Sequence, residues 1–396
     1  MSQRPPVRIG LDVLVHEEMA RLRGLKVALL GNPVSVNRDY VHLLDLCLRY
    51  DVNLVRLFGP EHGLLGDVQY MAEVASTTDP RTGLDVVSLY GATRDTLFLK
   101  AEDLRGVDVL VCDLQDIGSR YYTYAYTIAF AMQACAEAGV RCMVLDRPNP
   151  IGGMLVEGNE VKDAYRSFVG EYPLPNRTAL TLGELCRFFR SHDAHNVDLE
   201  VVWAEGWKRE MFHEETGAPW VMPSPNMPTP TTALVYPGAC IFEGTNISEG
   251  RGTTLPFEIL GAPFVDPFQW LDAMQKEGLP GVRFRPCYFQ PTFDKHEGKR
   301  CGGLQVHIED RRSFRPLLTY VALLRNVMKF SGFDWRREPY EYVSDRLAID
   351  LLFGDDHPRE MLVQGAGTDE IIAYLSQDAA RIENRRQEAL YAGYES

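Results

Sequence analysis

Short apolar runs alternate with amphipathic segments through the first half of the chain. Each run is rich in β-branched residues and apolar on both faces, which is typical of buried strands in a parallel sheet. The runs are KVALL (26–30), NLVRLF (53–58), DVVSLY (85–90), DVLVCDL (108–114), RCMVLD (141–146) and LEVVW (199–203). Their alternation with helical patterns predicts a doubly wound α/β domain.

Two of the intervening helices have readable ends. Apolar residues from Tyr122 to Ala136 follow helical spacing and stop at Gly139, a residue type that readily adopts the left-handed conformation after a helix. Thr181 and Glu184 form a capping box ahead of another apolar stretch. Both segments are therefore expected to be helices.

A proline-rich segment at 218–238 marks the expected domain boundary. It holds six prolines, so neither a helix nor a central strand is expected to persist there. The predicted division is a catalytic domain at 1–220 and an ancillary α+β domain at 221–396 that completes a cleft. The segment is either a linker or an extended wall of that cleft, where Trp220, Asn226 and Tyr236 could face a ligand.

The second half of the chain mixes both kinds of pattern. Strands are expected near 282–290 and 304–308. The helical periodicities lie near 266–277, 315–329, 345–352 and 368–391.

Polar residues gather just after the apolar runs. Ligands of open α/β sheets bind beyond the carboxyl ends of the strands, so these positions indicate the site. The substrate contacts expected from the first, fourth and fifth runs are Asn32, Arg120, Tyr121, Tyr122, Arg147 and Asn149.

The Gly-Pro-Glu-His-Gly turn at 59–63 follows the second run. Its glycines let the backbone turn sharply, so the side chains of Glu61 and His62 project. A carboxyl group held against aromatic neighbours favours its neutral form, which suits a general acid. We expect Glu61 to be catalytic and His62 to orient it or polarise a ligand, with Asp116 as a candidate partner; the alternatives are a solvated loop glutamate and a structural histidine.

A glycine-rich loop at 243–254 matches neither G-x-x-x-x-G-K-[ST] nor G-x-G-x-x-G, so nucleotide binding is disfavoured. Its Glu243, Asn246, Glu249 and Arg251 suit the hydroxyls of a polyol, and Asn226 is expected to join them. The alternative is a polar surface loop. Glu243 and Glu249 are also candidates, besides Asp116, for the partner carboxylate of Glu61.

Composition excludes several other classes. A formal net charge of −14 without a basic stripe argues against nucleic acid as a partner, and no apolar stretch reaches the length of a membrane span. The chain has no H-E-x-x-H, no G-x-S-x-G and no C-x-x-C, so neither a metal nor any other cofactor is expected. Its eight cysteines are expected to be reduced core residues. That expectation, and a start without a signal peptide, favour the cytoplasm, unless a signal has been removed.

Several long motifs resemble those of NamZ-type exo-β-N-acetylmuramidases, glycoside hydrolase family 171. They are LFGPEHG (57–63), DLQDIGSRYYTYAYT (113–127), LDRPNPIGG (145–153), EG (157–158), PSPNMPTPTTALVYPG (223–238) and EGTNISEGRGTT (243–254). The resemblance implies a Rossmann-like domain with a smaller ancillary domain and a cleft between them. It implies release of N-acetylmuramic acid from non-reducing ends of peptidoglycan fragments, with Glu61 as the catalytic acid.

Three questions stay open in the sequence. A catalytically silent muropeptide-binding protein, or a sugar-phosphate-dependent enzyme, are alternatives to the glycosidase. The mechanism can be retaining, inverting or assisted by the 2-acetamido group of the substrate. Specificity for muramic acid is expected to rest on an arginine that binds the lactyl carboxylate, with Arg120, Arg147 and Arg251 as candidates; ion pairs that hold the loops are the alternative role for each.

Overall fold

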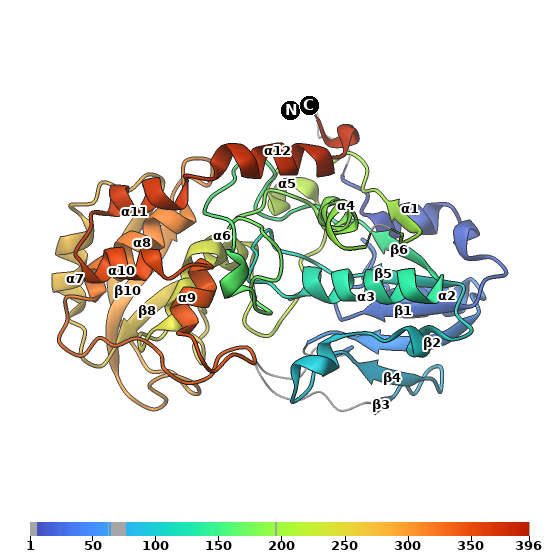
Figure 1. Cartoon of the computed structure of the whole chain (residues 1–396), viewed down its shortest axis with the longest axis horizontal. Helices are drawn as coiled ribbons and strands as arrows, with labels where there is room; N and C mark the ends of the chain where they lie inside the picture. Colours follow the sequence, from blue (N-terminus) through green and yellow to red (C-terminus); the bar gives the residue numbers. More distant parts are fainter. Residues whose placement is uncertain (1–5, 62, 65–76, 195, 396) are drawn as a thin grey trace.

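A seven-stranded sheet forms the first part of the protein (Figure 1). The computed structural model describes residues 6–61, 63–64, 77–194 and 196–395. The strand order is β3-β4-β2-β1-β5-β6-β7, and β3 alone runs antiparallel to its neighbour. The strands are β1 Val27–Gly31, β2 Leu54–Gly59, β3 Thr77–Thr78, β4 Asp85–Ser88, β5 Val109–Asp113, β6 Arg141–Leu145 and β7 Leu199–Val202. All six predicted strands are confirmed, and β3 is an addition.

The sheet is buried on both faces because alternate side chains of each strand point to opposite sides. Ala28 and Leu30 of β1 join one core with the residues of α3 and α4. Val27 and Leu29 join a separate core with α1 and α2. The helices of this part are α1 Gly10–His16, α2 Leu43–Arg49, α3 Tyr124–Ala138, α4 Leu182–His192 and α5 His213–Thr216. The doubly wound, Rossmann-like class is thereby confirmed.

The two predicted helix ends are also confirmed. Helix α3 ends at Gly139, whose φ of 66° is the left-handed conformation. At α4 the Thr181 hydroxyl accepts from Glu184 N–H (3.3 Å) while the Glu184 carboxylate accepts from Thr181 N–H (3.0 Å). Short 3₁₀ helices complete the description of the chain: Ala20–Leu22, Arg94–Leu97, Ala101–Leu104, Asp163–Tyr165, Cys240–Gly244 and Ala392–Tyr394.

The second part is a small antiparallel sheet with helices, as predicted. Its strand order is β8-β10-β9, with β8 Ile259–Ala262, β9 Val282–Phe289 and β10 Cys301–Ile308. The helices are α6 Pro230–Ala239, α7 Pro267–Met274, α8 Pro316–Val327, α9 Ala348–Phe353, α10 His357–Val363, α11 Thr368–Leu375 and α12 Ala379–Ala389. The single helix expected at 368–391 is two helices, and α10 and β8 are additions.

The prediction that no helix persists at 218–238 is wrong, because α6 begins at Pro230. Proline is favourable at the first helical position, where its missing N–H has no helical partner to lose. Thr229 caps the helix by accepting a hydrogen bond from Thr232 N–H (3.2 Å). Pro237 falls in the last turn, so the helix loses one backbone bond near its end.

The C-terminal segment returns to the first part of the protein. Helix α12 packs against α4 and runs along the upper side of the view in Figure 1. Beyond α12, the Tyr391 ring stacks on Trp203 with centroids 4.1 Å apart. The Tyr394 hydroxyl donates to the buried carboxylate of Asp146. The predicted boundary after residue 220 stays a prediction, since the chain crosses it again at this contact.

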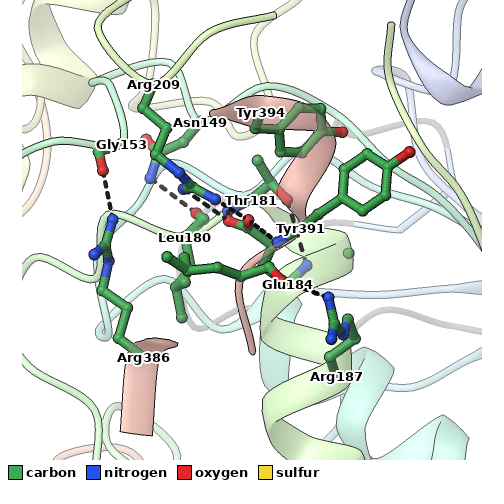
Figure 2. A network of polar contacts seen from close by, with 12 residues as sticks. Asn149, Gly153, Leu180, Thr181, Glu184, Arg187, Arg209, Arg386, Tyr391 and Tyr394 are labelled. Atoms are coloured by element: carbon green, nitrogen blue, oxygen red, sulfur yellow. Dashed lines mark hydrogen bonds and ion pairs between the residues drawn. The ribbon is translucent and has the colours of Figure 1, made fainter. Parts of the chain in front are cut away.

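A second buried carboxylate, that of Glu184, joins the C-terminal segment to α4 (Figure 2). It accepts from Tyr391 N–H (2.8 Å) and forms an ion pair with Arg209. The side chains of Glu184 and Arg209 are 0% and 8% exposed. One carboxylate thus joins the α4 cap, the Arg209 guanidinium and the C-terminal segment.

Arg209→Met is expected to lower the free energy of unfolding by about 3–5 kcal/mol, because it leaves the Glu184 charge buried without its cation. The matched control is Arg8→Met, since the pair of Arg8 with Glu205 is 41% and 48% exposed. That variant is expected to change stability by less than about 1 kcal/mol. Urea unfolding measures both, and equal small losses would contradict the assigned role of Glu184.

Candidate active site

A cavity lies at the edge of the first sheet where ligands of this fold class bind. The order β4-β2-β1-β5-β6-β7 changes direction between β1 and β5, and such a switch point opens a crevice at the carboxyl ends of the strands. Residues that follow β2 and β5 line the cavity on one side, and residues from the second half of the chain line the other. The predicted residues that it brings together are Glu61, Tyr121, Tyr122, Asn226, Glu243 and Arg251.

Glu61 reaches this cavity from a tight turn after β2. A Cβ atom on Gly59 would lie 2.7 Å from the Leu64 nitrogen, so this position requires glycine. Gly63 N–H closes the turn on the Pro60 carbonyl (2.9 Å) with a φ of 80°. The buried Glu61 carboxylate accepts a hydrogen bond from the Thr123 hydroxyl (2.9 Å). His62 lies outside the described residues.

Thr123 immediately precedes α3, so the Glu61 carboxylate lies beside the start of a 15-residue helix. Helix N-termini carry partial positive charge and stabilise an anion placed there. Tyr124, the first residue of α3, donates to the Pro223 carbonyl (2.6 Å), which joins the helix to the proline-rich segment. The fold therefore supplies a polar, positively polarised support for this carboxylate.

Tyrosine rings form one wall of the cavity. The Tyr122 ring meets Tyr124 edge to face at 5.1 Å and Tyr236 at 5.9 Å. Burial raises the pKa of Tyr124 well above its usual value, and the neighbouring charge of Glu61 adds to this effect. The phenols stay neutral at physiological pH, so the wall offers flat apolar faces and hydroxyl groups, which suit a sugar ring.

A charged network reaches the cavity through Glu243 and Arg251. The Arg251 guanidinium pairs with Glu243 (2.7 Å) and Glu249 (3.2 Å), and Lys295 pairs with Glu249 (2.8 Å). The Tyr340 hydroxyl donates to Glu243 Oε2 (2.7 Å). Burial raises the pKa of Glu243, but the Arg251 charge and the hydrogen bonds from Tyr340 and Arg251 outweigh it and lower that pKa. Glu243 is thus held as a carboxylate.

Glu341 also lines the cavity, and the sequence did not predict this carboxyl group as part of the site. Its side chain is buried, and Tyr340 and Thr123 are further residues missed in the same way. Glu341 lies in the charged stretch RREPYEYVSDR (336–346), which resembles a solvated loop when read along the chain. Only its contact in space with the rim of the sheet distinguishes Glu341 from a solvated loop residue, and the sequence does not show that contact.

Asp116 lies outside the lining of this cavity, buried beneath the loop after β5. Its carboxylate accepts from Gly118 N–H (2.6 Å). Burial raises the pKa of Asp116 to about 7, although the N–H groups of Gly118 and Ile117 lower it in part. The hydrogen bond from Gly118 N–H ties Asp116 to its own loop.

Two of the three candidate arginines also lie outside the lining. Arg120 donates to the carbonyls of Asn159 (2.5 Å), Leu174 (3.0 Å) and Leu352 (2.8 Å). The Arg147 guanidinium forms a bidentate pair with Asp113 (2.6 and 2.9 Å) and also donates to Val36 (3.1 Å). Arg251 is the candidate arginine that the described lining contains.

The remaining predicted residues hold loops. Asn32 accepts from Val34 N–H (3.1 Å), and Asn149 donates to Leu180 (2.9 Å). Asn246 donates to Gly332 (2.7 Å) and lies in a separate cleft that includes Lys295 and Trp335. Glu249 lies outside the cavity lining and pairs with Arg251 (3.2 Å).

Two kinds of feature are absent from the described part of the chain. It contains no group of three or more His, Cys, Asp or Glu side chains that could hold a metal ion. Its helices include none of sufficient length and apolarity to cross a membrane.

A doubly wound domain, with several carboxyl groups and an arginine in a cavity at its switch point, defines a carboxylate-based hydrolase site. Family models described as the N-terminal and C-terminal parts of the exo-β-N-acetylmuramidase NamZ match residues 27–231 and 234–391. The chain therefore belongs to the NamZ family of exo-β-N-acetylmuramidases.

Individual relatives agree with this assignment. The peptidoglycan β-N-acetylmuramidase NamZ of Bacillus subtilis (strain 168) is 40% identical over 98% of this chain and 92% of its own length. A crystal structure of a DUF1343 family protein from Bacteroides fragilis NCTC 9343 has a TM-score of 0.86 and 34% identity, and covers 98% of this chain and 99% of that one. A second DUF1343 structure from that organism has a TM-score of 0.76 and 26% identity, and covers 99% and 100%.

Asp116→Asn is expected to flatten the pH dependence of stability. The pKa of this carboxyl is about 7 in the folded protein against 3.8 in the unfolded chain, so folding takes up a proton and stability falls as pH rises from about 4 to 7. The asparagine amide oxygen can still accept the hydrogen bond from Gly118 N–H, but the amide takes up no proton on folding. Urea unfolding at several pH values measures the effect, with exposed Asp39→Asn as the control; parallel profiles for Asp116→Asn and the unmodified protein would contradict it.

Proposed function

We propose that this chain is an exo-acting β-N-acetylmuramidase that releases N-acetylmuramic acid from the non-reducing ends of peptidoglycan fragments. The observation that supports this most is the cavity that joins Glu61, Glu243 and Arg251 in a chain of this family. The B. subtilis relative, which matches almost end to end, is named a peptidoglycan β-N-acetylmuramidase. No resident cofactor is needed, because glycosidases use carboxyl groups of the chain itself.

We propose Glu61 as a catalytic group of this enzyme. Glycoside hydrolysis needs one group that protonates the leaving oxygen and one that stabilises or attacks the anomeric centre. Glu61 lies in the cavity with its carboxylate supported by Thr123. The role expected for it from the sequence, the general acid, stays a prediction, as do the roles of His62 and Asp116.

Recognition of the lactyl group is proposed for Arg251. The lactyl carboxylate is the group that distinguishes N-acetylmuramic acid from N-acetylglucosamine. Arg251 lies in the cavity lining with its charge divided between Glu243 and Glu249. A planar guanidinium suits recognition of a carboxylate, because its fork of N–H groups matches the two carboxylate oxygens. Asn226 and the tyrosine wall are proposed to contact the sugar ring.

The proposed setting is the recycling of muropeptides inside the cell. All eight cysteines are free and buried in the structure, which suits a reducing compartment.

Glu61→Gln is expected to reduce kcat on a chromogenic N-acetylmuraminide by about 10²–10⁴-fold, because the amide can neither exchange a proton nor carry charge. The exposed residue Glu102 provides a matched control, and Glu102→Gln is expected to keep full activity. Circular dichroism would show whether the fold is intact. Turnover of Glu61→Gln close to that of the control would refute the assignment, and a wild-type protein that binds but never cleaves muraminides would refute the proposed activity.

Arg251→Lys is expected to narrow the discrimination between muraminide and glucosaminide substrates by about tenfold or more. Loss of a charge-assisted bidentate contact of roughly 1.5–3 kcal/mol accounts for this size. The ratio of kcat/KM on the two substrates is the measurement, and exposed Arg312→Lys is the control. An equal loss on both sugars would show that Arg251 supports the loop and does not read the lactyl group.

A further inference from the structure

Glu341 lies in a turn whose backbone is unfavourable for its residue type. Tyr340 and Val343 pair through two backbone hydrogen bonds of 2.9 Å, which leaves Glu341 and Tyr342 as the two central residues of a hairpin. Their φ values are 44° and 66°. A two-residue hairpin with both central φ values positive is normally built from Asn-Gly or Asp-Gly, because larger side chains disfavour the left-handed region. Strain of this kind concentrates at functional sites.

Side chains on both sides hold this turn against the cavity. The Tyr340 hydroxyl donates to Glu243 (2.7 Å). The Tyr342 hydroxyl donates to the Gly91 carbonyl (2.9 Å), just beyond β4 of the first sheet. The turn therefore joins the second part of the protein to the rim of the sheet, and Glu341 lies between these two anchors.

The carboxyl group of Glu341 is buried and only partly compensated. Its side chain is 4% exposed, and its Oε2 atom has no hydrogen-bond partner within residues 6–61, 63–64, 77–194 and 196–395. The charged groups that face it are Glu61, Glu243, Arg251 and Arg336. Burial and the charges of Glu61 and Glu243 raise its pKa well above the usual value, and the two arginines offset this only in part.

Glu61 has the complementary environment in the same cavity. A hydroxyl donor and the N-terminus of α3 support its negative charge. When two carboxyl groups share a site, the one without donors retains the proton. Where two neighbouring carboxyl groups have environments that favour different protonation states, the neutral group can act as the acid and the other as its ionised partner.

We propose that Glu341 is the general acid of the glycosidase reaction and that Glu61 is its ionised partner. This rests on the proposed function and gives Glu341 the role that the sequence predicts for Glu61. Glu341 O–H transfers its proton to the glycosidic oxygen as the bond from that oxygen to the anomeric carbon breaks, and the leaving sugar departs as an alcohol. The Glu61 carboxylate stabilises the positive charge that develops on the ring. Water then supplies hydroxide to the anomeric carbon, and its remaining proton restores the Glu341 carboxyl.

Leaving-group dependence separates the two roles. A dinitrophenyl muraminide needs no protonation to depart, whereas an alkyl muraminide or a muropeptide does. Glu341→Gln is expected to lose at least about 100-fold in kcat on the alkyl substrate and less than about tenfold on the dinitrophenyl substrate. Glu61→Gln is expected to lose heavily on both, because charge stabilisation is needed with either leaving group.

The pH profile of kcat/KM gives an independent readout. On the alkyl substrate, the rate of the unmodified protein is expected to fall at alkaline pH as Glu341 loses its proton, and this fall is expected to be absent from the residual activity of Glu341→Gln. Glu338→Gln, at an exposed position of the same segment, is the control and is expected to match the unmodified protein. If Glu61→Gln is the variant that the activated substrate rescues, Glu61 is the acid and the proposal is wrong. If wild-type protein cleaves no muraminide at all, the proposed function fails first.

Stability distinguishes a catalytic from a structural Glu341. Asparagine tolerates the left-handed conformation better than glutamate does, so Glu341→Asn is expected to raise Tm by about 1–2 °C while activity on the alkyl substrate is lost. A lower Tm with activity reduced equally on both substrates would mean that Glu341 only holds the turn, and this result would overturn the proposal.

Discussion

Repulsion between carboxyl groups in one buried cavity is the constraint on which the rest of this site depends. Glu61, Glu243 and Glu341 line the same space, and burial makes each additional negative charge more costly. The protein neutralises two of them locally. Glu243 has Arg251 and the Tyr340 hydroxyl, and Glu61 has Thr123 at the start of α3. At Glu341 the charges of Arg251 and Arg336 offset burial and repulsion only in part, so the proton required for acid catalysis is expected to reside there.

The architecture explains how these groups meet. The doubly wound sheet places the loop after β2 and the start of α3 at one rim, which fixes Glu61 and its donor. The second part of the chain contributes Glu243, Arg251 and the strained hairpin from the opposite side. The C-terminal segment then returns and joins α4 through Glu184, so the two sides of the cavity belong to one connected structure.

Local patterns predicted the parts of this structure that depend on local physics. The six predicted strands are short apolar runs, and the ends of α3 and α4 follow from Gly139 and the Thr181 capping box. Effects that depend on the position of a residue within a helix were harder to predict. The prolines at 218–238 argued against a helix, yet Pro230 is the first residue of α6, where a helix tolerates proline.

The residues of the site also divide into those that the local sequence predicts and those that only the packed structure reveals. Glu61 was predictable because it follows a strand at its carboxyl end. Arg120 and Arg147 have the same sequence context, but their guanidinium groups are used by backbone carbonyls and Asp113, which only the packed structure reveals. Glu341 was not predictable, since a positive φ at a glutamate and a contact with the distant rim leave no trace in the local sequence.

The most direct test is to observe the proton itself. Carbon-13 labelling of glutamate carboxyl groups, with Glu341→Gln to assign the signal, gives the pKa of Glu341 by NMR titration. The account predicts a carboxyl that stays protonated well above the ordinary glutamate value of about 4.3, and a pKa that falls when Glu61→Gln removes the neighbouring charge. A Glu341 signal that titrates at about 4.3, unchanged by that substitution, would contradict it.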